Sequence, residues 1–190
     1  MPFMNMFRFL DILLSLIILF VALPICFFTS IAIIIIDGKP IFYISKRAGL
    51  YGKIFSTFKF RTMKLKNNIL DQDEITFLGR YLRRLSIDEL PQFYNVLKGD
   101  MSIVGPRPHL IEQTKFYSTE VKNFMQRHKC LPGITGWAQV NGLRGPTIEE
   151  GTMNKRFQHD LYYIKNWNLM FDFYIMIKTF FVILFQKVDE

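Results

Sequence analysis

Two adjacent carboxylates, Asp88 and Glu89, are the residues of this 190-residue chain best suited to chemistry. They follow Ser86 at the expected start of a helix that would run from about Ser86 to Leu97. In one interpretation Ser-x-x-Glu is a capping box, and Asp88 merely favours the positive end of the helix. In the other, Asp88 is a carboxylate nucleophile that the helix N-terminus keeps ionised, and both carboxylates bind a hard cation such as Mg²⁺. The local sequence leaves both interpretations open.

Arginines that could bind phosphate lie on both sides of this pair. Arg83 precedes it, and Arg107 stands between Pro106 and Pro108. The two prolines favour an extended backbone, which would present the guanidinium of Arg107 in a fixed direction. Arginine binds phosphate oxygens well because its planar fork can donate two parallel hydrogen bonds. The alternative is a rigid surface turn.

Two more cations, Lys59 and Arg61, alternate with Phe58 and Phe60. A period of two predicts a strand with both aromatic rings on one face and both cations on the other. A small β-hairpin is expected from two short segments joined through a glycine-containing turn, Ile41–Lys46 and Ile54–Arg61. The basic face is either a solvated edge or a cationic wall for phosphate. Cations near a carboxylate pair suit phosphoryl transfer, which depends on positioning and charge neutralisation.

Several other classes of site are excluded. The chain has no Gly-x-x-x-x-Gly-Lys-Ser/Thr loop and no Gly-x-Gly-x-x-Gly motif. His109, His128 and His159 are dispersed, without the spacing of metal ligands. Two cysteines, Cys26 and Cys130, are too few for a disulfide scaffold or a cysteine-based zinc site.

An apolar leader is expected to place the protein at a membrane. Arg8 and Asp11 are its only charges, and the run from Ile12 to Ile36 contains 25 uncharged residues. That length is enough to cross a bilayer and too long for the core of a signal peptide. The net charge of +8 therefore belongs to the rest of the chain. By the positive-inside rule the flank after the run stays cytoplasmic, because no acid interrupts a series of cations: Lys39, Lys46, Arg47, Lys53, Lys59, Arg61, Lys64 and Lys66.

Pro24 lies in the middle of this run and removes a helix hydrogen bond. The result is either a kinked spanning helix or a re-entrant helix that enters and leaves by one face. Ser15, Thr29 and Ser30 carry the hydroxyls that could bond the freed carbonyls.

The rest of the chain predicts an α+β, mainly helical fold. We expect two parts, a membrane helix over 1–36 and a catalytic domain over 37–190 on the cytosolic face. Helices are expected over 75–98 and 110–129, with a glycine-rich loop from Leu131 to Gly142. Aromatic amphipathic helices from about Lys155 to Lys187 either lie at the membrane interface or pack on the core. A phospholipid surface is therefore favoured over nucleic acid as the partner of the basic charge.

Five sequence blocks stand in an order that resembles the bacterial sugar transferases, also called monotopic phosphoglycosyl transferases. The resemblance runs from about Phe9 to the C-terminus. The block from Ser86 to Pro108 is long and specific. The matching blocks are Lys59–Met63, Ser86–Gln92, Asn95–Ser102, Val104–Pro108 and Gly133–Val140.

This resemblance implies transfer of a sugar-1-phosphate from a UDP-sugar to undecaprenyl phosphate, the first membrane step of glycan assembly. UMP would leave, and undecaprenyl-diphosphate-sugar would be formed. Asp88 would be the nucleophile of a covalent phosphosugar intermediate, Glu89 would organise it and support Mg²⁺, and substrate phosphates would be bound by Lys59, Arg61, Arg83 and Arg107. The family also implies a re-entrant helix broken at Pro24, which makes the protein monotopic on the cytoplasmic face of the bacterial inner membrane.

Two departures from the family pattern are visible. Leu23 stands before Pro24 where many small members have serine, and the segment Gly142–Thr147 is more similar to the larger multi-pass members. We interpret the chain as a small single-domain form. The sequence leaves open which UDP-sugar is used, which glycan pathway follows and whether the protein is a homo-oligomer. The alternatives to an enzyme are a catalytically silent membrane scaffold for glycan enzymes, and an unrelated basic protein that binds the membrane surface.

Overall fold

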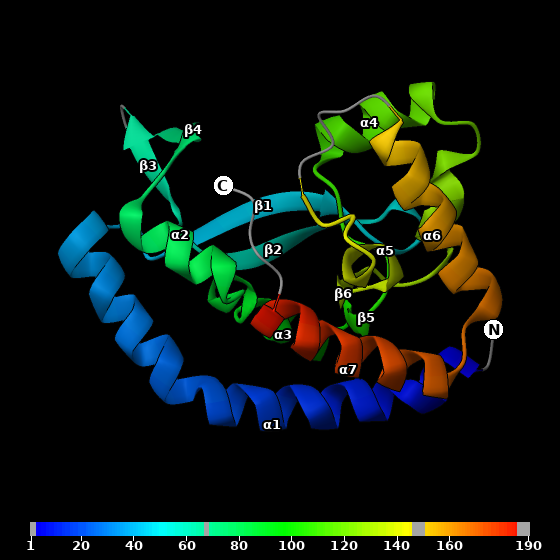
Figure 1. Ribbon diagram of the computed structural model, residues 1–190, viewed down its shortest axis with the longest axis horizontal. Coiled ribbons are helices and arrows are strands. Elements are labelled where there is room, and N and C mark those ends of the chain that lie inside the picture. The colour runs from blue at the N-terminus through cyan, green and yellow to red at the C-terminus, as the bar shows by residue number, and fades with distance from the viewer. Residues whose placement is uncertain (1–2, 67–68, 146–150, 186–190) are drawn as a thin grey trace.

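The computed structural model describes residues 3–66, 69–145 and 151–185, and these residues are mostly helical (Figure 1). The helices are α1 (Phe3–Ala32), α2 (Phe77–Arg84), α3 (Gln92–Lys98), α4 (Ile111–Glu120), α5 (Trp137–Val140), α6 (Thr152–Asn166) and α7 (Leu169–Phe185). The strands are β1 (Phe42–Ala48), β2 (Ile54–Phe60), β3 (Met63–Lys66), β4 (Ile69–Ile75), β5 (Ser102–Val104) and β6 (Gly133–Thr135). Four short helical turns are η1 (Ile33–Asp37), η2 (Leu50–Gly52), η3 (Ile87–Glu89) and η4 (Phe124–Lys129). The prediction of a mainly helical α+β fold is confirmed.

The strands form three separate pairs. β1 and β2 are antiparallel, with Phe42 opposite Phe60 and Ala48 opposite Ile54, so the expected hairpin is confirmed. β3 and β4 form a second antiparallel pair. β5 and β6 are parallel, which brings segments about 30 residues apart in sequence side by side. The sequence predicts a glycine-rich loop over 131–142, whereas the structure has β6 and α5 there.

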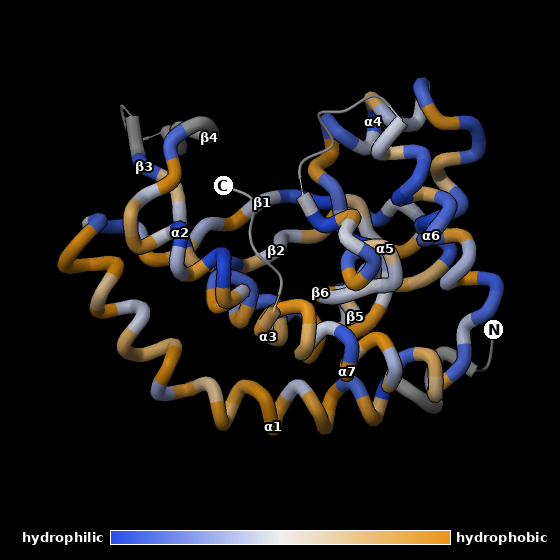
Figure 2. Tube along the Cα trace, in the orientation of Figure 1, coloured by the Kyte–Doolittle hydropathy of each residue, from blue (hydrophilic) through white to orange (hydrophobic). Residues whose placement is uncertain are grey.

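Helix α1 lies along one edge of the molecule and is apolar almost throughout (Figures 1 and 2). The helical stretch from Arg8 to Asp37 is long and apolar enough to cross a membrane. Many of its large side chains are exposed, including Phe9, Phe20, Phe28 and Ile35. Exposed apolar surface of this extent indicates membrane association.

The prediction that Pro24 breaks this helix is not confirmed. Pro24 lies inside α1, which continues as helix to Ala32 and then as the π-helical turn η1. The ribbon changes direction along its length and rises towards the hairpin (Figure 1). Of the hydroxyls proposed to bond freed carbonyls, Ser30 donates to the carbonyl of Cys26 at 2.7 Å, four residues earlier, and the buried hydroxyl of Ser15 has no hydrogen-bond partner among the described residues.

Both ends of the membrane helix contact the rest of the fold. Near its start, Arg8 donates to three backbone carbonyls at the end of α3 and beyond it: Val96, Leu97 and Met101. Asp11 accepts a hydrogen bond from the backbone N–H of Ile103 at 3.2 Å. At the other end, buried Ile33 packs with Phe60 and Leu82. The two charges of the leader are therefore used to attach it to the rest of the described fold.

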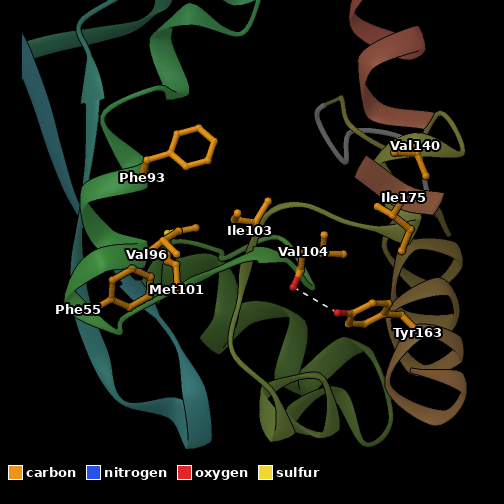
Figure 3. Close-up of a cluster of buried hydrophobic side chains, with 9 residues drawn as sticks. All are labelled: Phe55, Phe93, Val96, Met101, Ile103, Val104, Val140, Tyr163 and Ile175. Atoms are coloured by element: carbon orange, nitrogen blue, oxygen red, sulfur yellow. Dashed lines mark hydrogen bonds between the residues drawn. The ribbon is translucent and has the colours of Figure 1, made fainter. Parts of the chain in front are cut away.

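The main core lies between the hairpin and the C-terminal helices (Figure 3). Its buried side chains come from β2, α3, the segment through β5, and α5 to α7: Phe55, Phe93, Val96, Met101, Ile103, Val104, Val140, Tyr163 and Ile175. The hydroxyl of Tyr163 donates to the carbonyl of Val104 at 3.2 Å, which satisfies a polar group at the centre of the cluster. β5 is thus held between α3 and α6.

The one or two amphipathic helices expected near the C-terminus are present as two, α6 and α7. Within α7 only Ile175 is buried, and an apolar set remains exposed: Met170, Phe173, Ile177, Phe180, Phe181, Leu184 and Phe185. One line of α7 therefore packs on the core, and the rest has the composition of an interfacial helix. The sequence left two alternatives open for this segment, packing on the core or lying at the membrane interface. The buried Ile175 supports the first for one side of α7, and the exposed apolar side chains support the second for the rest.

Candidate active site

Asp88 and Glu89 lie on the short turn η3, between α2 and α3. The prediction that a helix begins near Ser86 is wrong, because Ser86 has left-handed backbone angles (φ 57°, ψ 20°) and α3 begins only at Gln92, after Pro91. The capping box is also absent. Ser86 makes no capping hydrogen bond with its side chain, and Glu89 is turned towards cations instead. The turn directs both carboxylates into the protein, where they are 6% and 5% exposed.

Glu89 collects the cations of the site. Lys59 and Arg107 both donate to its Oε1, at 2.7 and 2.9 Å. Arg144 lies 3.5 Å from its Oε2. Asp88 has a looser environment, because its nearest cation is Lys59 at 4.0 Å and its buried Oδ1 has no hydrogen-bond partner among the described residues. Three cations and two carboxylates leave one net positive charge, which favours an anionic substrate.

The protein shifts the pKa values of the two neighbouring carboxyls in opposite directions. Burial raises the pKa of Asp88, Lys59 opposes that shift, and the adjacent charge of Glu89 reinforces it. Burial would also raise the pKa of Glu89, but the charges of Arg107, Lys59 and Arg144 hold it well below its usual range. The N-terminus of α3, which was expected to favour the ionised form of Asp88, does not act directly on this carboxyl. The physical reason is that Asp88 sits on a buried turn and not in the first turn of α3.

Arg107 is positioned by close backbone contacts between β5 and the segment around β6. The backbone N–H of Gly105 donates to Thr135, and that of Gly133 donates to Pro106. A Cβ at Gly133 would lie 2.1 Å from the nitrogen of Gly105, and a Cβ at Gly136 would lie 2.1 Å from its oxygen. Only glycine fits at these two positions. Gly105 is equally restricted, because a Cβ there would lie 2.5 Å from the carbonyl oxygen of Leu131, so both motifs, Val104–Pro108 and Gly133–Val140, require glycine.

Two further arginines hold the backbone of this segment. Arg127 donates to the carbonyl of Arg107 at 2.9 Å and forms a buried ion pair with Asp160. Arg47 donates to the carbonyl of Pro108 at 2.6 Å. Burial and the charge of Arg107 lower the pKa of Arg47 to about 10. The extended Pro-Arg-Pro segment predicted from sequence is thus fixed from both sides.

Lys59 is positioned through Asn95 of α3. The side-chain amide of Asn95 is fully buried and bonds both ways to β2, accepting from Phe58 N–H at 3.1 Å and donating to the Ser56 carbonyl at 2.7 Å. The strand that carries Lys59 is thereby attached to the helix that follows the carboxylates. A fixed distance between Lys59 and Glu89 follows from this contact.

The other two predicted phosphate ligands differ from each other. Arg83 donates to Thr62 at 2.8 Å, and its pKa is lowered by burial and raised by the charge of Asp88, so it lies within the field of the site. Arg61 does not. It is 2% exposed, and its guanidinium donates to four backbone carbonyls: Asp37, Gly38, Pro40 and Met63. We therefore leave Arg61 out of the phosphate-binding set, because its hydrogen-bonding capacity is used to close the end of α1 on the hairpin.

The residues present fit a magnesium ion held jointly with substrate. The unpartnered buried Oδ1 of Asp88 is an oxygen ligand of the kind Mg²⁺ prefers. Within the described ranges no three acidic, histidine or cysteine residues cluster, so the protein alone supplies no closed cage. One or two carboxylates completed by phosphate oxygens is the usual arrangement for this ion.

Comparison with known proteins identifies the family. A family model described as bacterial sugar transferase matches residues 4–186, nearly all of the chain. The chain belongs to this family. As a bacterial sugar transferase it shares 47% identity, over 78% of its length and 32% of the relative's, with UDP-glucose:undecaprenyl-phosphate glucose-1-phosphate transferase of Xanthomonas campestris pv. campestris. An Escherichia coli (strain K12) protein of the same name is 42% identical over 90% of this chain and 38% of its own length.

A third relative is named for another sugar. UDP-N-acetylgalactosamine-undecaprenyl-phosphate N-acetylgalactosaminephosphotransferase of Aeromonas hydrophila is 37% identical over 93% of this chain and 43% of its own length. This bacterial sugar transferase spans about a third to two fifths of these three relatives. The carboxylate turn and the Pro-Arg-Pro segment both lie within residues 4–186, the part of the chain that the family model matches.

Sequence reasoning on this bacterial sugar transferase missed three residues that the structure brings to the site. Asn95, Arg127 and Arg144 position or contact the charged cluster, but none had been given a role. Asn95 and Arg144 stand in segments that were singled out, Asn95–Ser102 and Gly142–Thr147. Arg127 carried no signal, because a buried ion pair joining residues 33 positions apart leaves no local pattern.

Proposed function

We propose that this protein transfers a sugar-1-phosphate from a UDP-sugar to undecaprenyl phosphate, with release of UMP. The names of the relatives support this reaction class. The observation that carries the proposal is the free buried oxygen of Asp88 beside Glu89, which gathers Lys59, Arg107 and Arg144. A nucleophile with an open position next to fixed cations suits displacement at a phosphorus atom.

In the first step the Asp88 carboxylate attacks the β-phosphorus of the donor. A bond forms between one carboxylate oxygen of Asp88 and phosphorus, and the bond from phosphorus to the bridging oxygen breaks. That oxygen leaves with the electron pair, as part of UMP. Lys59 and Arg107 neutralise charge on the phosphoryl oxygens, because Glu89 already holds them at fixed positions.

In the second step an oxygen of the lipid phosphate attacks the same phosphorus. The bond to Asp88 breaks, the carboxylate is restored, and undecaprenyl-diphosphate-sugar is the product. UMP departs before the lipid reacts, so the kinetics are ping-pong. Asp88 and Glu89 would hold Mg²⁺, which supplies charge neutralisation for the diphosphate when it is bound.

Placement of α1 as a re-entrant helix explains how the site meets a lipid phosphate. Arg8 near one end of α1 bonds to α3 and Met101, and Asp37 at the other end accepts from Thr76 at 2.9 Å. A helix that crossed the bilayer would separate these ends by the hydrocarbon core. Contacts of both ends with one globular body support entry and exit on the same, cytoplasmic face.

The donor sugar is proposed only as a class. Two relatives are named for glucose and one for N-acetylgalactosamine, and the shared chemistry is the uridine diphosphate. The alternative, a silent scaffold, is disfavoured by the arrangement of Asp88, Glu89 and their cations, since a scaffold needs no free buried carboxylate oxygen.

The test is UMP release by purified protein with undecaprenyl phosphate, Mg²⁺ and a panel of UDP-sugars. Asp88→Asn keeps the size of the side chain and removes the nucleophilic carboxylate. We expect UMP with at least one sugar, no UMP from Asp88→Asn, and a phosphosugar adduct on Asp88 by mass spectrometry when the lipid is omitted. Full activity of Asp88→Asn would overturn the assignment of the nucleophile. Folded protein that releases no UMP with any sugar would favour the scaffold.

A further inference from the structure

Among the cations of the site that the structure describes, Arg144 lies furthest along the chain, after Lys59, Arg83 and Arg107. Its guanidinium lies 3.5 Å from Oε2 of Glu89. This is the longest ion pair of the three that Glu89 makes, and the Arg144 side chain is 28% exposed, against 14% for Lys59 and 21% for Arg107. Among the described residues its side chain makes no other ion pair or hydrogen bond, although its charge also lowers the pKa of Asp88. Arg144 is therefore the cation least committed to the protein.

The backbone around Arg144 is fixed although its side chain is open. The N–H of Leu143 donates to Ala138 at 3.0 Å. On the other side, Arg156 of α6 donates to the carbonyl of Gly145 at 2.7 Å. Arg156 is 4% exposed, so a buried charged group holds the described residues that follow α5, up to Gly145. Such a support places Arg144 at the carboxylate pair and leaves its guanidinium free to change partner.

We propose that Arg144 is a catalytic residue that binds the β-phosphate of a nucleoside diphosphate substrate. The inference rests on the proposed function and adds a residue to its site. In the free protein Arg144 pairs weakly with Glu89. When the donor binds, its planar fork turns to the phosphate oxygens, while Lys59 and Arg107 keep Glu89 neutralised at Oε1.

The position of Arg144 selects the β-phosphate over the α-phosphate. Asp88 must reach the phosphorus that carries the sugar, which is the β-phosphorus. Glu89 is its direct neighbour on the turn, and Arg144 contacts the carboxylate oxygen of Glu89 that is not occupied by Lys59 or Arg107. A phosphate within reach of Asp88 is therefore also within reach of Arg144. UDP contains this phosphate and UMP lacks it.

The experiment measures binding of UDP and of UMP by calorimetry in the Asp88→Asn background, which separates binding from turnover. Arg144→Gln is compared with Arg144→Lys and with Arg80→Gln, a control at an exposed arginine of α2. We expect Arg144→Gln to weaken UDP binding about tenfold or more, since hydrogen bonds to charged groups contribute on that scale. Its affinity for UMP changes less than twofold. Arg144→Lys lies between, because it keeps the charge and loses the fork.

The outcomes separate this inference from the proposed function. If UDP does not bind at all and wild-type protein releases no UMP, the proposed function fails. If UDP binds, and Arg144→Gln binds it as tightly as Arg80→Gln does, only the assignment of Arg144 fails. Equal losses for UDP and UMP also overturn it, because they indicate a role in holding the loop. Should Arg144→Gln fail to fold, Arg144→Lys provides the test. A larger loss of affinity for UDP than for UMP supports the assignment of Arg144, and equal losses or no loss overturn it.

Discussion

The ammonium group of Lys59 lies 2.7 Å from Oε1 of Glu89 but 4.0 Å from the nearer oxygen of Asp88. The two carboxylates are adjacent in sequence, so this asymmetry results from the turn that carries them. Glu89 receives the cations and stays ionised, whereas Asp88 keeps an oxygen free. One residue thus organises charge and the other remains available to react.

Replacement of Glu89 by glutamine is expected to destabilise the fold. Lys59, Arg107 and Arg144 would lose their shared counter-ion, and removing one partner from a buried ion pair costs about 3 kcal/mol. Thermal unfolding in detergent should show a clearly lower midpoint for Glu89→Gln. The matched control is Glu74→Gln, whose partner Lys64 is 55% exposed, as is Glu74 itself. Exposed pairs contribute little, so the control should differ from wild type by less than about 0.5 kcal/mol. Equal shifts in the two variants would contradict this account of Glu89.

Sequence predicted the candidate site better than it predicted the local structure around it. Asp88, Glu89 and Arg107 were identified because their types and neighbours are unusual, and the structure brings them together. The capping box was an equally good local interpretation, since Ser-x-x-Glu has the same letters in both roles. The left-handed angles of Ser86 exclude the capping box, and such angles are rare for a residue other than glycine.

Residues that act across the fold could not be predicted. Arg61 and Arg83 looked equivalent in sequence, yet Arg61 is used to bind the carbonyls that follow α1. Period two places Lys59 and Arg61 on one face of a strand, but β2 ends at Phe60 and Arg61 leaves that face. The apolar run was identified from length alone, whereas the course of α1 past Pro24 depends on contacts at both of its ends.

Gly136 should not tolerate even alanine. A Cβ there would lie 2.1 Å from the carbonyl oxygen of Gly105, so the backbone that leads to Arg107 would have to move. We expect Gly136→Ala to lower the unfolding midpoint and to reduce UMP release. Gly145→Ala is the control for stability, because a Cβ at Gly145 meets nothing within 4 Å. A wild-type midpoint and wild-type activity for Gly136→Ala would show that the close approach to Gly105 is not required.

Arg8 is expected to couple the membrane helix to the site. Its guanidinium bonds to the carbonyls of Val96, Leu97 and Met101, around the connection from α3 to β5. Glutamine is shorter and can donate only two hydrogen bonds, so Arg8→Gln leaves carbonyls unsatisfied. The free energy of unfolding should fall by about 2 kcal/mol. Chemical denaturation in detergent would measure it, with Arg80→Gln as an exposed arginine control. Equal free energies of unfolding for Arg8→Gln and Arg80→Gln would show that Arg8 does not have this role.

Acid should destabilise the protein partly through His128. Burial, with the charge of Arg127, lowers the pKa of this imidazole from 6.5 to about 4, and its Nδ1 lies 3.1 Å from the Gly49 carbonyl. Between these two pH values the unfolded chain binds a proton at His128 and the folded protein does not. The contribution of His128 to stability is therefore present above pH 6.5 and is lost as pH falls towards about 4.

His128→Asn tests this assignment, because asparagine can donate to Gly49 from nearly the same position and does not titrate. The unfolding midpoints of wild type and variant are measured at pH 7.5 and pH 5. Other groups, including His109, titrate in both proteins and cancel in the comparison. We expect the midpoint of wild type to fall more between the two pH values than that of His128→Asn, so that the difference between them narrows or reverses at pH 5. A constant difference would mean that His128 does not contribute to the acid sensitivity.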